Sequence, residues 1–123
     1  MLGLPEGKDW GTTQCIFKND SVEVHRIFAF KGGYCSEHVH SSKFNQFYVE
    51  SGSLEVSIFS NNNQQSMHSA KSTVNHGMSL VVKPGVKHKF EAMEDTIAFE
   101  IYWTEIDSFD ITRYKSGGIV NDP

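Results

Sequence analysis

The chain has 123 residues, of which 38% are hydrophobic and 12% aromatic, and its formal net charge at pH 7 is −4. This length fits one compact domain, and the composition is that of a chain with a packed core, which excludes a disordered protein. The densest basic group is only three lysines, at positions 83, 87 and 89, so we expect no nucleic-acid partner.

Two features bear on the compartment. The chain has two cysteines, Cys15 and Cys35, which are too few for a disulfide scaffold. We therefore expect reduced thiols in a cytoplasmic protein, with a single bridge between the two as the alternative. The first residues, MLGLPEGKDWG, lack the pattern of a secretory signal, and no apolar run approaches the ~20 residues that span a bilayer, so we expect no membrane partner.

Strand signals dominate the chain. Apolar residues alternate with polar ones, or form short β-rich runs between turn residues, in five segments: 22–30, 47–49, 54–58, 79–83 and 96–103. The best candidate for a helical turn is 105–113, and 115–123 is typical of a loose tail. Many short strands in one small domain predict an all-β fold, an antiparallel sandwich or barrel.

The most unusual stretch contains two histidines, His38 and His40, one residue apart. Side chains alternate along a strand, so both would project from the same face. Asn45 shares its parity with Phe47 and Val49, which suggests that this parity points into the barrel.

A third histidine, His88, follows a Pro-Gly turn at the start of another predicted strand. From the pattern alone, His38, His40 and His88 could equally be metal ligands or structural histidines. We expect structural roles for His25 and His76, whereas His68 lies in a polar turn and is expected to be solvated.

These residues resemble the motifs of the cupins. The first cupin motif has the form G-x5-H-x-H-x(3,4)-E-x6-G, and the second G-x(5 to 7)-P-x-G-x2-H. This chain matches the first over residues 32–52 and the second over 77–88, where Pro and Gly are adjacent rather than separated: Gly32, His38, His40, Asn45 and Gly52, then Gly77, Pro84, Gly85 and His88. The resemblance implies a single cupin domain over 1–123, a double-stranded β-helix (jelly-roll barrel), with the three histidines as metal ligands.

Within the cupins, the chain resembles the small cupin domain of type II mannose-6-phosphate isomerases over roughly residues 9–114. The matching segments are Asp9-Trp10-Gly11, Ser36-Glu37-His38-Val39-His40, Phe99-Glu100-Ile101 and Asp110-Ile111-Thr112-Arg113. Two departures affect the site. Asn45 stands where the family has a ligand Glu, so it would be at most a weak, uncharged ligand, and Lys43 replaces an arginine.

The resemblance implies a divalent transition metal acting as a Lewis acid on a sugar or sugar phosphate. Three neutral imidazoles suit Zn, Fe, Ni or Cu, and Mn is also open. Glu100 matches the glutamate of the family's IEV segment, so the resemblance implies Glu100 as the candidate catalytic base. Glu37 has the opposite parity to the histidines and is expected to face away from them. Lys43 and Arg113 are candidates for binding an anionic group of the ligand, and a solvated or ion-paired surface charge is the alternative for both.

Three functions remain open on these residues. The first is binding or isomerisation of a carbohydrate-like ligand at the metal. The second is oxygen chemistry of the dioxygenase type at a His-ligated Fe or Ni, and the third is metal or carbohydrate binding without turnover. Because an open jelly roll exposes strand edges, and Tyr48, Phe59 and Tyr102 would lie on its outer face, we also expect a homodimer.

Overall fold

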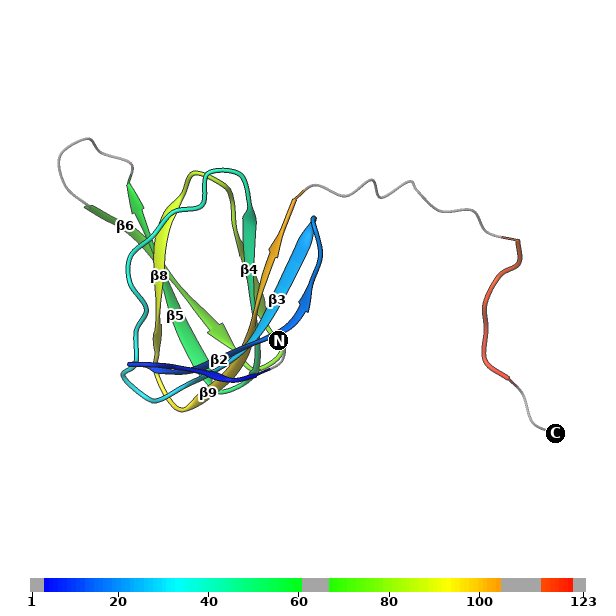
Figure 1. Ribbon diagram of the computed structural model, residues 1–123, viewed down its shortest axis with the longest axis horizontal. Helices are drawn as coiled ribbons and strands as arrows, with labels where there is room; N and C mark the ends of the chain where they lie inside the picture. The colour runs from blue at the N-terminus through cyan, green and yellow to red at the C-terminus, as the bar shows by residue number, and fades with distance from the viewer. Residues whose placement is uncertain (1–3, 61–66, 105–113, 121–123) are drawn as a thin grey trace.

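The computed structural model describes residues 4–60, 67–104 and 114–120 and shows two antiparallel sheets that face each other (Figure 1). The larger sheet has the strand order β1-β2-β3-β9-β4-β7 and the smaller one the order β6-β5-β8. The strand bounds are β1 Glu6–Lys8, β2 Gly11–Lys18, β3 Val22–Ala29, β4 Phe44–Ser51, β5 Ser53–Ser60, β6 Met67–Asn75, β7 Ser79–Val82, β8 Lys87–Ala92 and β9 Thr96–Trp103.

The predicted all-β, jelly-roll architecture is confirmed. Each of the five predicted strand segments overlaps a strand, and the run 96–103 coincides with β9. No helix occurs in the described residues, and none of them therefore belongs to a helix long and apolar enough to cross a bilayer. Cys15 and Cys35 are both free thiols.

The core lies between the sheets and consists of the inward apolar side chains of seven strands. Its fully buried members are Ile27, Ala29, Phe47, Val49, Leu54, Val56, Val74, Val82, Phe90, Ala92 and Ala98. On β4 the buried parity is the predicted one, with Asn45 at the same depth as Phe47 and Val49. The alternation of β4 therefore carries a polar amide into an otherwise apolar interior.

On β3 the more apolar parity in the sequence, which carries Val22, Val24, Phe28 and Phe30, is expected to face the core, but it is not the buried one. Ile27 and Ala29 are buried, whereas Phe28 and Phe30 pack edge-to-face against each other on the outside, with ring centroids 5.1 Å apart. The inward parity starts with two polar residues, Glu23 and His25, which line a pocket rather than the core.

The turn between β4 and β5 depends on a glycine. Gly52 has φ +99°, a conformation that side chains with a Cβ rarely adopt. A Cβ at this position would also lie 2.4 Å from Oγ1 of Thr96 and 2.6 Å from the carbonyl oxygen of Asp95. The motif glycine is therefore required by close packing between this turn and the start of β9.

The segment between β3 and β4 follows β8 without forming a continuous strand. Its backbone pairs with β8 through two isolated bridges, Tyr34 with Glu91 and His38 with His88. The amide of His38 donates to the carbonyl of His88 at 3.0 Å, and the amide of His88 donates back at 2.9 Å. This pairing brings two histidines that are 50 positions apart in the sequence directly opposite each other.

Several predictions fall on parts of the chain outside the described residues. These are the helical turn at 105–113, Arg113 itself and the end of the predicted tail. The described part of the tail is exposed, with Ile119 and Val120 each at least 90% accessible.

Candidate functional site

Three histidines converge near one end of the barrel. Potential ligand atoms of His38, His40 and His88 all lie within 4.8 Å of one another. Their ring centroids are 4.4 Å apart for His38 and His88, 5.0 Å for His38 and His40, and 5.6 Å for His40 and His88. Ligand atoms ~2.1 Å from one metal are at most ~4.2 Å apart, so binding would draw the rings slightly closer together.

Backbone hydrogen bonds fix the tautomer of two of these rings. Nδ1 of His38 donates to the carbonyl oxygen of Ser36 at 2.8 Å, and Nδ1 of His88 donates to that of Val86 at 2.9 Å. Because a carbonyl oxygen only accepts, each Nδ1 carries the hydrogen, and the neutral ring presents the lone pair of Nε2. This is the arrangement that orients metal-ligating imidazoles in proteins.

The third ring is held with a nitrogen that has no protein partner. Nε2 of His40 is buried, and among the described residues nothing forms a hydrogen bond to it. A buried polar nitrogen without a partner costs about 1–3 kcal/mol. A cation shared with His38 and His88 would remove this cost, so the donor set fits a metal.

Burial keeps the histidines in the form that binds metals. The pKa of His88 is lowered to about 4, mainly by desolvation; a hydrogen bond to the backbone of Val86 opposes the shift, and the nearby rings of His38 and His40 add to it. Desolvation also lowers the pKa of His40, with smaller contributions from His38 and Lys43. His88 is therefore neutral at physiological pH, and neutral imidazole is the ligating species.

Asn45 reaches the same group from β4. Its side chain is fully buried, its Oδ1 lies 3.0 Å from Nε2 of His88, and its Nδ2 has no partner among the described residues. A buried amide oxygen therefore lies beside the histidines, where it brings no negative charge.

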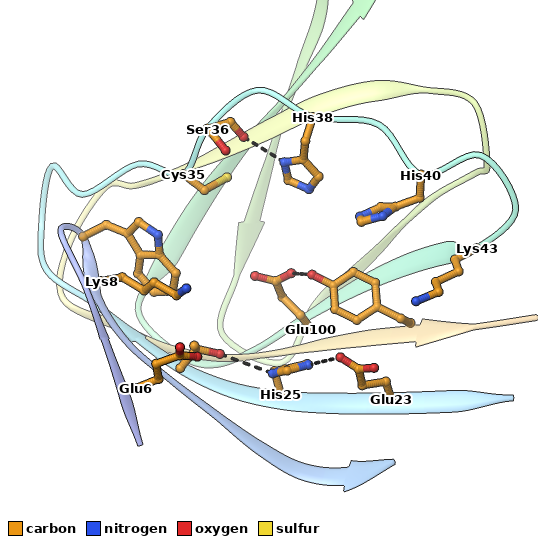
Figure 2. Close-up of a pocket in the computed structure, with 13 residues that line it drawn as sticks. Glu6, Lys8, Glu23, His25, Cys35, Ser36, His38, His40, Lys43 and Glu100 are labelled. Carbon is orange, nitrogen blue, oxygen red and sulfur yellow. Dashed lines mark hydrogen bonds and ion pairs between the residues drawn. The ribbon is translucent and has the colours of Figure 1, made fainter. Parts of the chain in front are cut away.

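A pocket of about 380 Å³ opens in front of the histidines (Figure 2). His38 and His40 line one side, and Glu100 of β9 lies across from them. Tyr102, two residues further along β9, also lines the pocket. The hydroxyl of Tyr102 donates a short hydrogen bond to Oε2 of Glu100. Burial is the main cause that raises the pKa of Glu100, which favours the protonated acid, and it also raises the pKa of Tyr102.

The other candidate residues fall into three groups. Lys43 lines the pocket, with its Nζ 5.9 Å from the centre of the Tyr102 ring. Glu37 does not line it and instead lies 3.6 Å from Nζ of Lys87, as its parity predicted. Arg113 lies outside the described residues. Tyr102 corrects an expectation, because it faces the pocket and not the outer surface of the barrel.

The sequence analysis missed a second cluster in the same pocket. His25, which we expected to be structural, lies with its Nε2 2.5 Å from Oε2 of Glu23, and both residues line the pocket. Both are on β3 at positions of the same parity as Ile27 and Ala29. That shared parity was the signal that could have revealed them.

Comparisons with known proteins agree with this description. The cupin family model (Cupin) matches residues 19–117. An RmlC-like cupin from Shewanella frigidimarina is 19% identical, with a TM-score of 0.69 and coverage of 87% of this chain and 88% of that one. KdgF from a Halomonas species is 16% identical, with a TM-score of 0.68 and coverage of 83% and 86%.

A third solved structure is the oxalate decarboxylase of Lactobacillus farciminis, at 18% identity and a TM-score of 0.67, where the match covers 84% of this chain and 31% of that one. A comparison with curated proteins found no match. At these identities the structural likeness concerns the fold alone, but the family model spans most of the sequence. The chain belongs to the cupin family.

Proposed function

We propose that this cupin binds one divalent transition metal through His38, His40 and His88 and uses it to bind a carbohydrate-like ligand. The observation that supports this most strongly is the buried, unpartnered Nε2 of His40, beside two rings whose Nδ1 atoms are tied to backbone carbonyls. Three neutral nitrogens without a carboxylate suit Zn, Fe, Ni or Cu, with Mn also open.

When bound, the metal would supply Lewis acidity, polarising a carbonyl or hydroxyl oxygen of the ligand. The side chains of the pocket would do the rest. Glu100, which is buried and hydrogen-bonded to Tyr102, would hold a proton near the ligand. Because its pKa is raised, it would start protonated and act as a proton donor in the first step. Lys43 is placed at the rim to attract an anionic group such as a phosphate.

The lining of the pocket favours this function over the alternatives. Oxygen chemistry on an apolar substrate would call for an apolar pocket, whereas this one carries two lysines, three glutamates and three histidines: Lys8, Lys43, Glu6, Glu23, Glu100, His25, His38 and His40. A purely structural site would be filled by side chains, and this one leaves an open cavity. The resemblance to type II mannose-6-phosphate isomerases supports a sugar or sugar phosphate as the ligand.

Metal analysis tests the proposal. Protein purified without added metal and then dialysed against Zn²⁺ should retain about one equivalent per chain, as measured by elemental analysis. His40→Ala should lose most of it. His76→Ala is the matched control, because His76 contacts the carbonyl of Glu50 outside the pocket and should leave the metal content unchanged. Retention of one equivalent by His40→Ala would contradict the proposal.

A further inference from the structure

The pocket wall across from His38 and His40 carries a carboxylate–imidazole pair, Glu23 and His25 (Figure 2). Oε2 of Glu23 lies 2.5 Å from Nε2 of His25, and both side chains are about three-quarters buried. The hydrogen bond to His25 is the largest cause that lowers the pKa of Glu23, and Lys18 adds a weaker attraction at 3.8 Å. Glu23 is therefore ionised and can only accept a hydrogen bond.

An ionised acceptor at Nε2 fixes the state of the other ring nitrogen. With Nε2 donating to Glu23, the neutral ring has its lone pair on Nδ1. Nδ1 lies 3.4 Å from Oγ1 of Thr13, which is a long hydrogen bond. Thr13 also lines the pocket, so the lone pair points to a place where a ligand group can replace a weak contact.

The position of His25 relative to Glu100 indicates that this lone pair can act as a base. The two residues are direct partners on the neighbouring antiparallel strands β3 and β9, and both side chains face the pocket. Their surroundings differ, because Glu100 is buried and bonded to a phenol, whereas His25 is bonded to a carboxylate. Paired groups in such opposite environments are the usual signature of an acid and a base.

We propose that His25, positioned by Glu23, is the proton acceptor of this pocket and acts on ligands with a C–H bond next to a carbonyl, the α-hydroxy aldehydes and ketones. This rests on the proposed function and names its substrate class. His25 would contact the substrate and is the catalytic residue, whereas Glu23 acts through His25 and is a positioning residue.

The step conserves atoms and electrons without any further reactant. Nδ1 of His25 takes the proton from the α-carbon, and the C–H electron pair forms the carbon–carbon double bond of an enediol. The carbonyl π pair moves to oxygen, which receives a proton from Glu100. Return of a proton from His25 to the neighbouring carbon, and of the hydroxyl proton to Glu100, completes an aldose–ketose interconversion.

Hydrogen–deuterium exchange tests the proposal directly. Zn²⁺-loaded protein is incubated in D₂O with dihydroxyacetone or glyceraldehyde, and loss of the α C–H signal is followed by proton NMR. His25→Gln should lower the exchange rate by about 10²–10⁴-fold, the usual contribution of a general base, without loss of zinc. Glu23→Gln should lower it by a smaller factor. His76→Gln, outside the pocket, should exchange at the wild-type rate.

A second readout does not depend on turnover. Nitrogen-15 NMR of the imidazoles should show His25 as the Nε2–H tautomer in the wild type, and Glu23→Gln should lose that preference. Two results would overturn the inference without touching the metal site. One is an exchange rate in His25→Gln equal to that of the wild type, and the other is no exchange by wild-type protein that holds one zinc per chain. If the wild type binds no zinc, the proposed function fails, and an Nδ1–H tautomer of His25 would overturn the inference separately.

Discussion

Nε2 of His88 and Oδ1 of Asn45 lie 3.0 Å apart in the fully buried interior of the barrel. Since Nδ1 of His88 donates to a backbone carbonyl and its low pKa keeps the ring neutral, Nε2 presents a lone pair toward an amide oxygen. Two such acceptors repel each other unless a cation lies between them. His88 and Asn45 would therefore both hold a metal bound at this position.

Asn45 is therefore predicted to set the metal affinity. Asn45→Asp adds a negative charge beside the metal and should raise the Zn²⁺ affinity by about tenfold or more, and Asn45→Leu should lower it by about 10–100-fold. Competition with a chromogenic chelator measures both. Asn75→Asp, on a residue bonded to Ser53 at the surface, is the control. Equal affinities for Asp, Asn and Leu at position 45 would show that the amide does not take part.

The stability of the metal-free protein should fall on acidification. The native pKa of His88 is about 4 against an ordinary value of 6.5, so the unfolded chain binds a proton more readily within this window. The free energy of unfolding should then drop as pH falls from 6.5 toward 4, by on the order of 3 kcal/mol at most.

Glu100 acts in the opposite direction, because its raised pKa makes the native state retain a proton and destabilises it as pH rises above 4.5. Glu100→Gln removes this opposing contribution. The free energy of unfolding of this variant should therefore fall more steeply between pH 7 and pH 5 than that of the wild type. Urea unfolding with chelator present, at pH 7 and pH 5, measures the difference. If the free energy of unfolding of Glu100→Gln falls no more steeply than that of the wild type, the raised pKa of Glu100 is refuted.

How much of the fold and of the candidate site could be predicted from the sequence depends on whether each side chain faces the core, the pocket or solvent. The strands and the inward position of Asn45 could be predicted from the alternation of apolar and polar residues. The three histidines were predicted as ligands only through the resemblance to the cupin motifs, because their pattern alone fits a structural role equally well. The inward position of His25 was missed because the opposite parity of the same strand, with Val22, Val24 and Phe28, is the more apolar one in the sequence, although Ile27 and Ala29 share the parity of His25.

The edge strands were also hard to predict. β2 and β6 lie toward the edges of their sheets, and few of their described side chains are buried. Over residues 70–75 of β6 the one fully buried apolar side chain is Val74, and both sequences lack the apolar alternation of the central strands. Tyr102 was misplaced for a related reason. An aromatic near the end of a strand can close the core or line a pocket, and only the arrangement of the neighbouring strands decides between them.

Lys43 should control the affinity for anionic ligands. Its ammonium lies at the pocket rim over Tyr102, and no described residue forms an ion pair with it. Lys43→Met keeps the aliphatic stem but removes the charge, and should weaken binding of mannose 6-phosphate about tenfold without affecting mannose. Isothermal titration calorimetry compares the two sugars, with Lys71→Met as control, since Lys71 pairs with Glu55 outside this pocket. Equal losses for both sugars would count against an anion subsite.

The predicted homodimer now depends on the outer face of the larger sheet. Tyr48 of β4 and Val81 of β7 are each about two-fifths exposed there, whereas Tyr102 no longer contributes. Light scattering at micromolar concentration should give twice the 13.9 kDa of one chain, and Tyr48→Lys should shift it toward the monomer. Thr73→Lys, on the smaller sheet, should not. A wild-type species of 13.9 kDa would refute the prediction.

X-ray absorption spectroscopy of the zinc-loaded protein tests the central claim most directly, because the multiple-scattering signal of imidazole counts the histidines bound to the metal. We predict three imidazole nitrogens at ~2.0–2.1 Å, falling to two in His38→Ala and in His88→Ala. A spectrum that shows one imidazole or none, or that is unchanged when either histidine is removed, would contradict a metal held by His38, His40 and His88.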